Sequence, residues 1–135
     1  MKKISLLIID DSPLIKARIK DLLDDIGVIK QQLIARTFAE GLSLIDIYLP
    51  DVILLDINLP DGNGLKNLHY LKQTYPAIKI IIITNQDNEK YAQQSLDFGA
   101  HCFLDKSYDF HKLPSIIINI SSGDDEFQAT AKKLN

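Results

Sequence analysis

Five short apolar runs constrain the fold of this chain more than any other feature of its sequence. The runs are largely continuous instead of alternating between apolar and polar residues, and together they are rich in isoleucine and leucine. Strands of a parallel sheet that helices cover on both faces have this composition. The runs are residues 4–9, 32–35, 52–55, 78–83 and 100–104.

Segments with helical periodicity separate these runs. In the first three segments, apolar residues three or four positions apart predict one buried face each. These residues are Ile15, Ile19, Leu22, Leu23 and Ile26, then Leu42, Ile45 and Leu49, then Leu65, Leu68, Leu71 and Tyr75. Right-handed connections between the runs then predict a doubly wound α/β fold of five βα units around a five-stranded parallel sheet.

The last two helices are expected at residues 88–98, ended by Gly99, and at residues 109–120. Pro114 would fall beyond the first turn if Asp109 is the cap, so we expect the fifth helix to begin late or irregularly. The consecutive isoleucines of this helix cannot all point inward, and some of them are expected at the surface.

Composition restricts the class of protein. A chain of 135 residues with 46% hydrophobic residues and a net charge of -3 predicts one globular domain, placed at residues 1–120, and a polar tail at residues 121–135. The sequence contains no basic patch and no apolar stretch of membrane-spanning length, which disfavours nucleic acid and membrane as partners. Cys102 is the single cysteine, so no disulfide can close within the chain, and a cytoplasmic location is expected.

Charged and polar residues stand where the predicted strands end. Asp10 and Asp11 follow the first run, Asp56 the third, Thr84 the fourth and Lys106 the fifth. In a sheet of order 2-1-3-4-5, the first and third strands are neighbours where the order reverses, and ligands bind beyond their carboxyl ends. The three aspartates should therefore meet at one edge of the sheet, together with Thr84 and Lys106.

Electrostatic repulsion predicts that this cluster binds a cation. Two like charges about 4 Å apart repel by about 4 kcal/mol at an effective dielectric constant near 20. A sparse set of oxygen ligands favours Mg²⁺ over calcium or zinc. Neither the Gly-x-Gly-x-x-Gly fingerprint nor a Walker lysine motif is present, so no nucleotide cofactor is expected. The segment Asp61-Gly62-Asn63-Gly64 predicts only a turn before the third helix.

These residues, in this order, resemble the receiver domain of two-component response regulators, from about residue 3 to residue 120. The matching residues are Asp10, Asp11, Asp56, Asn58, Leu59, Pro60, Gly64, Thr84 and the segment 99–106. The resemblance implies that Asp56 accepts a phosphoryl group from a histidine kinase, a phosphotransfer domain or a small acyl phosphate. It also implies a signalling domain instead of an enzyme, apart from self-catalysed phosphotransfer and dephosphorylation.

The resemblance further implies a role for each neighbour of Asp56. Asp11 and Asp56, with the backbone carbonyl of Asn58, would hold Mg²⁺, and Asp10 would complete the metal site by orienting a metal-bound water. Lys106 would bind the phosphoryl oxygens.

Thr84 and Phe103 would form the switch. Thr84 would donate its hydroxyl once the phosphoryl group is present, and Phe103 would turn inward. The face made by the fourth helix, fifth strand and fifth helix would then change its contacts with a second copy or a target protein.

Two departures and two alternatives accompany the resemblance. Asn85 stands where the family usually has a small residue, and Ser107 stands where proline is commonest, which leaves open whether the Lys106–Ser107 bond is cis. One alternative is a non-phosphorylated pseudo-receiver that acts only through protein contacts. The other alternative is a magnesium-dependent hydrolase with an aspartyl intermediate. It is less favoured, because such enzymes require a second aspartate at the position that Asn58 occupies here.

Some of these residues also have simpler interpretations. Asp10 and Asp11 could only cap the first helix, and Phe103 could be an ordinary core aromatic. The three histidines, His69, His101 and His111, share no ligand spacing and are expected at the surface or on helices.

Overall fold

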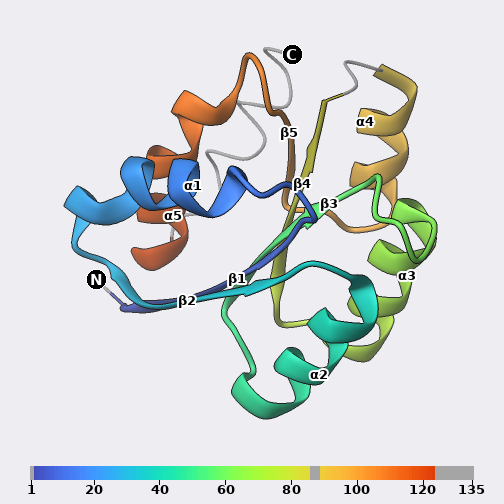
Figure 1. The fold of residues 1–135 in the computed structure, drawn as a ribbon, viewed down its shortest axis with the longest axis horizontal. Coiled ribbons are helices and arrows are strands. Elements are labelled where there is room, and N and C mark those ends of the chain that lie inside the picture. The colour runs from blue at the N-terminus through green and yellow to red at the C-terminus, as the bar shows by residue number, and fades with distance from the viewer. Residues whose placement is uncertain (1, 86–88, 124–135) are drawn as a thin grey trace.

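The computed structural model describes residues 2–85 and 89–123, which form a central sheet between two layers of helices (Figure 1). Most of the tail predicted at residues 121–135 lies outside the described residues. The elements are β1 (Ile4–Ile9), α1 (Ile15–Leu23), η1 (Asp24–Ile26), β2 (Ile29–Ala35), α2 (Phe38–Tyr48), β3 (Val52–Asp56), α3 (Gly64–Thr74), β4 (Lys79–Thr84), α4 (Glu89–Asp97), β5 (Cys102–Asp105), η2 (Phe110–Lys112) and α5 (Leu113–Ser121).

All strand pairs are parallel, and the strand order is β2-β1-β3-β4-β5. This order confirms the predicted doubly wound α/β fold. Ile9 pairs with Leu55, Asp56 with Ile83, and Thr84 with Asp105. The carboxyl ends of β1, β3, β4 and β5 therefore lie at one edge of the sheet.

Helices cover both faces of the sheet, and two apolar clusters fill the space beneath them. Helices α1 and α5 lie on one face, and α2, α3 and α4 lie on the other (Figure 1). Along β1, Leu6 and Ile8 belong to the first cluster, whereas Leu7 and Ile9 belong to the second. Burial on both faces explains why the apolar runs are continuous.

The edge strand β2 begins at Ile29, three residues before its apolar run. Residues Lys30 and Gln31 are more polar than the central strands because β2 has a strand neighbour on one side only. Polar side chains are tolerated in this strand because it is only partly buried. The apolar run at residues 32–35 therefore does not indicate where the strand begins.

One predicted core residue is at the surface. Leu49 was expected on the buried face of the second helix, but it is 64% exposed and ends α2 in a left-handed conformation with φ of 45°. A residue that precedes proline disfavours the helical conformation, and Pro50 follows directly. The helix therefore stops one residue before the periodic pattern does.

The fifth helix begins late, as Pro114 predicted. A 3₁₀ turn at Phe110–Lys112 precedes α5, which starts at Leu113 with the proline in its first turn. Proline is tolerated there because the first N–H groups of a helix have no intrahelical partner. Its consecutive isoleucines divide, since Ile116 and Ile117 are buried while Ile118 and Ile120 are partly exposed. Of the helices described, none is long and apolar enough to cross a membrane.

Candidate functional site

The carboxyl ends of three strands bring an acidic pair, a third aspartate and a lysine together. Asp10 follows β1 directly, Asp56 is the last residue of β3, and Lys106 follows β5. The Lys106 N–H donates to the Thr84 carbonyl at 2.7 Å, which continues the pairing of β4 with β5 into the site. The sequence expectation that these residues share one edge of the sheet is therefore met.

Lys106 forms a buried ion pair with two aspartates. Its Nζ lies 2.6 Å from Asp10 Oδ2 and 3.3 Å from Asp56 Oδ2. The side chains of Asp10, Asp56 and Lys106 are at most 8% exposed. Asp10 Oδ1 accepts from the Ser12 N–H at 2.7 Å in a local turn. Helix α1 begins later, at Ile15, and has no side-chain cap, so the alternative interpretation of these aspartates as caps of the first helix is wrong. One lysine thus faces two buried carboxylates.

The Asp56 carboxylate is held at both oxygens. Oδ1 accepts from the Asn58 N–H at 3.0 Å, and Oδ2 accepts from Lys106 Nζ. Burial raises the pKa of the Asp56 carboxyl and the nearby Asp10 carboxylate raises it further, against the lowering effect of the Asn58 N–H and Lys106. The net rise in pKa means that the ionised carboxylate is incompletely compensated by the protein alone.

Asp11 completes a set of oxygen ligands at the mouth of the site. It is exposed, and a carboxylate oxygen from each of Asp10, Asp11 and Asp56 lies within 4.8 Å of the others. Three carboxylates against one lysine leave an excess of negative charge beside solvent. This set fits a hard divalent cation such as Mg²⁺, which takes few protein carboxylates and keeps several waters.

The remaining predicted site residues lie around this cluster. Asn58 is exposed in the loop after β3, Thr84 is buried at the end of β4, and Phe103 is partly buried on β5 against the core beneath α2 and α3. Their positions are compatible with the predicted carbonyl ligand, hydroxyl donor and switch aromatic. The inward turn of Phe103 stays a prediction.

His101 is not a surface residue, contrary to expectation. It is 6% exposed, and its N–H donates to the Ile80 carbonyl at 2.7 Å. The pairing of β4 with β5 therefore extends one residue before Cys102, and the His101 side chain is buried at this position. An isolated histidine gives no sequence signal for such burial.

Asp105 has a structural role that the sequence did not reveal. Its Oδ1 accepts from the Ser107 N–H at 2.7 Å and from the Tyr108 N–H at 3.2 Å. These bonds hold the turn after Lys106, in the pattern that an aspartate makes with the backbone two and three residues on. None of the described peptide bonds is cis, so the Lys106–Ser107 bond is trans.

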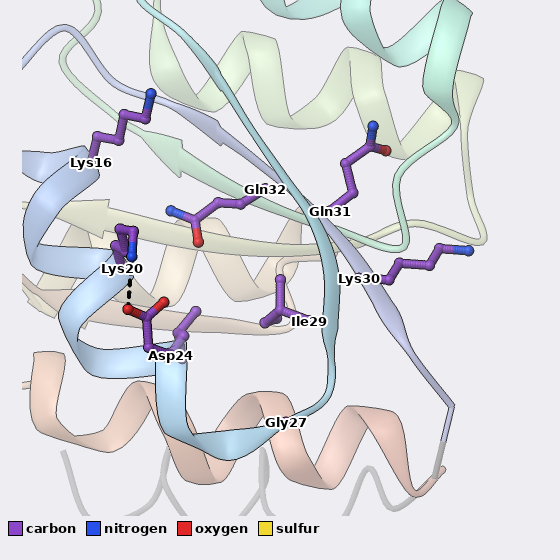
Figure 2. A pocket seen from close by; sticks show the side chains of 9 residues that line it. Lys16, Lys20, Asp24, Gly27, Ile29, Lys30, Gln31 and Gln32 are labelled. Carbon is purple, nitrogen blue, oxygen red and sulfur yellow. Dashed lines mark hydrogen bonds and ion pairs between the residues drawn. The ribbon is translucent and has the colours of Figure 1, made fainter.

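A hollow of about 350 Å³ lies between α1 and β2, away from the acidic cluster (Figure 2). Lys16, Lys20 and Lys30 line it with Gln31 and Gln32, and Lys20 is paired with Asp24 at 2.8 Å. Its strand residues come from the first half of β2, where Ile29 pairs with the first residue of β1. The hollow is therefore at the opposite end of the sheet from Asp56.

The raised pKa of Asp56 gives a testable dependence of stability on pH. The folded chain binds this proton more tightly than the unfolded chain, so ionisation costs more in the folded state. The cost is absent below the ordinary value near 3.8 and grows as the pH rises through the folded pKa. In metal-free buffer, Asp56→Asn should therefore be more stable than the parent at pH 7, and urea denaturation should show this advantage shrinking toward pH 4. An advantage that stays constant with pH would contradict the shift.

A family model described as the response regulator receiver domain matches residues 6–118. The transcriptional regulatory protein DegU of Brevibacillus brevis is 31% identical over 121 residues, which are 90% of this chain and 51% of DegU. The protein-glutamate methylesterase/protein-glutamine glutaminase of Pyrococcus horikoshii is 29% identical over 133 residues, 98% of this chain and 35% of that protein. This chain thus spans about half of DegU and about a third of the methylesterase.

Solved structures show the same fold. The signal receiver domain of a response regulator called NarL from Mycobacterium tuberculosis superposes with a TM-score of 0.79 at 25% identity. The superposition covers 91% of this chain and 99% of that domain.

Proposed function

This chain belongs to the response regulator receiver domain family, and we propose that it is a phosphorylation switch in which Asp56 is the phosphoacceptor. Receivers of this family act in phosphorylation-based two-component signalling. The observation that carries the assignment is the position of Asp56, buried beside Lys106 and within reach of two further carboxylates. A nucleophile that must receive an anionic phosphoryl group requires positive charge nearby. Lys106 supplies part of this charge, and a cation held by the carboxylates would supply the rest.

In the proposed reaction, an oxygen of the Asp56 carboxylate attacks the phosphorus of the donor. The bond from phosphorus to the leaving group breaks as the new P–O bond forms, and the leaving group departs with the bonding electrons. Lys106 neutralises charge on the phosphoryl oxygens, and the Thr84 hydroxyl donates to one of them. The Asn58 N–H keeps the other Asp56 oxygen in place, as its 3.0 Å hydrogen bond supports.

Mg²⁺ is the cation proposed for this site. Asp11 and Asp56 would hold it with the carbonyl of Asn58, and Asp10 would orient a bound water while it keeps its ion pair with Lys106. The cation would supply positive charge for the attacking oxygen and the phosphoryl oxygens. Oxygen-only ligands with one exposed member support this choice.

The proposed phosphodonor is a histidine kinase or a phosphotransfer protein, with small acyl phosphates as substitutes. Neither transcriptional regulation nor methylesterase activity is part of this proposal, because the chain covers only 51% of the transcriptional regulatory protein and 35% of the methylesterase. It would act without turnover of a separate substrate, and a cytoplasmic location belongs to the same proposal.

Intact-mass spectrometry after incubation with acetyl phosphate tests the function. With Mg²⁺ the chain should gain the mass of one phosphoryl group, and with EDTA it should gain none. A chain that stays unmodified with Mg²⁺ would instead be a pseudo-receiver that acts only through protein contacts.

The proposed output is a change in the face made by α4, β5 and α5. Tyr91 on α4 is 36% exposed and Tyr108 after β5 is 73% exposed, so both aromatic side chains are accessible to a partner. Phosphorylation would draw Thr84 toward the phosphoryl group and make room for Phe103 to turn inward. A partner, or a second copy, must bind the two states with different affinity for the switch to work.

Amide exchange and light scattering, with and without a beryllofluoride mimic of the phosphoryl group, test this output. Activation should change exchange in β5 and α5, and self-association should change if the partner is a second copy. Asp56→Asn with the same reagent is the control and should not respond. If both amide exchange and the molar mass from light scattering are unchanged in the activated parent, this output mechanism is rejected, even if Asp56 is phosphorylated.

A further inference from the structure

The loop of residues 57–63, which carries Asn58, is fixed at both of its ends. At its start, the Ile57 N–H donates to the Ile83 carbonyl at 3.1 Å, next to the bond from Asn58 to Asp56. At its end, Asn63 Oδ1 accepts from the Leu65 N–H at 3.0 Å and thereby caps α3. These hydrogen bonds fix only the two ends of the loop.

Asp61 ties the middle of this loop to a different helix. Its Oδ1 accepts from the Phe38 N–H at 2.7 Å, and its Oδ2 accepts from the Ala39 N–H at 3.0 Å. Phe38 and Ala39 begin α2, and the first N–H groups of a helix have no intrahelical partners. These bonds lower the pKa of the Asp61 carboxyl, and the positive end of the helix dipole also favours its negative charge.

A local residue satisfies only one of the free N–H groups at the start of α2. Thr37 is the N-cap residue, and its side chain accepts from the Glu40 N–H at 3.1 Å. The Asp61 carboxylate accepts from two more of these N–H groups, and in doing so it joins two connections that are more than twenty residues apart in the sequence.

Tight backbone packing transmits the position of this loop to the site. A Cβ atom on Gly64 would lie 2.4 Å from the Ile57 carbonyl oxygen, so the two ends of the loop are in close contact. A Cβ atom on Gly62, whose φ is 155°, would lie 3.1 Å from the Asn67 side chain. With this little free space, we expect a shift at Asp61 to displace the backbone at Ile57 and Asn58 as well.

We propose that Asp61 is a positioning residue for the metal site, which it preforms by holding the loop that presents the Asn58 carbonyl. This inference rests on the proposed function, because that function assigns the carbonyl to the cation. Asp61 itself would touch neither the cation nor the phosphoryl group. Outer partners that orient a ligand typically change metal affinity by 10–100-fold when they are removed.

The test compares Asp61→Ala with Thr37→Ala, a control that removes a cap from the same helix without touching the loop. The rate of labelling by acetyl phosphate is measured against Mg²⁺ concentration. For Asp61→Ala, half-maximal rate should require about tenfold more Mg²⁺, and saturating Mg²⁺ should restore most of the rate. Thr37→Ala should keep the parent's half-saturation concentration. Asp61→Asn retains one carbonyl acceptor, so it should fall between the parent and the alanine variant.

Two results would overturn the inference. One is an unchanged half-saturation concentration in Asp61→Ala, and the other is an equal shift in both alanine variants, which would mean that only α2 had been weakened. The Mg²⁺-dependent rise in Tm gives a second readout that needs no phosphorylation. A parent that binds Mg²⁺ but is never labelled would reject the proposed function and leave this comparison valid. A parent whose Tm ignores Mg²⁺ would reject this inference together with the metal site, while the role of Asp56 as phosphoacceptor would still be decided by labelling.

Discussion

Asp56→Asn should abolish the gain of phosphoryl mass from acetyl phosphate while the chain remains folded. Asparagine has nearly the same size as aspartate but lacks the attacking carboxylate, so the loss of labelling should be complete. A fold defect is not expected, because the substitution also removes a charge whose burial raises its pKa.

Asp51 provides the matched control, because it directly precedes β3, the strand that Asp56 ends. Its Oδ2 accepts from the Ser5 N–H at 2.8 Å, and its Oδ1 is paired with Lys2. Asp51→Asn should therefore be labelled as fully as the parent. Equal labelling of Asp56→Asn and the parent would place the phosphoryl group elsewhere.

Magnesium should stabilise the parent chain by about 2.7 kcal/mol when its concentration is a hundred times its dissociation constant. The physical reason is that three carboxylates face a single lysine at the site. Asp11→Ala should lose most of this response, because it removes the exposed ligand without disturbing the buried ion pair. Urea denaturation in EDTA and in Mg²⁺, at matched ionic strength, measures the difference.

Asp21→Ala is the control for a general effect of negative charge, since Asp21 is an exposed acid on α1. It should respond to Mg²⁺ like the parent. A parent chain with the same free energy of unfolding in EDTA and in Mg²⁺ would remove the metal site from the mechanism.

The sheet and the acidic cluster were predictable because both follow from strand order. Continuous apolar runs identify strands that are buried on both faces, and the carboxyl ends of such strands meet at one edge. The same reasoning brought Asp56 and Lys106 together across fifty residues of sequence. Helix ends were less predictable, as Leu49 illustrates, because the conformational effect of Pro50 overrides the apolar period.

Contacts between separate loops could not be predicted. Asp61 was correctly placed in a turn, but its bonds to α2 depend on how two connections lie in space. His101 is buried where the pairing of β4 with β5 extends beyond the strand, and the residue types around it do not indicate this extension. A pattern along one segment carries no information on such partners.

The identity of Asp56 as the phosphoacceptor is tested most directly by locating the modification. Borohydride reduces an aspartyl phosphate to homoserine, so the labelled chain is reduced, digested and sequenced by tandem mass spectrometry. Homoserine should appear at position 56, only after incubation with the phosphodonor and Mg²⁺, and at no other aspartate. Homoserine at Asp10 or Asp11, or a labelled chain with aspartate intact at position 56, would contradict the assignment.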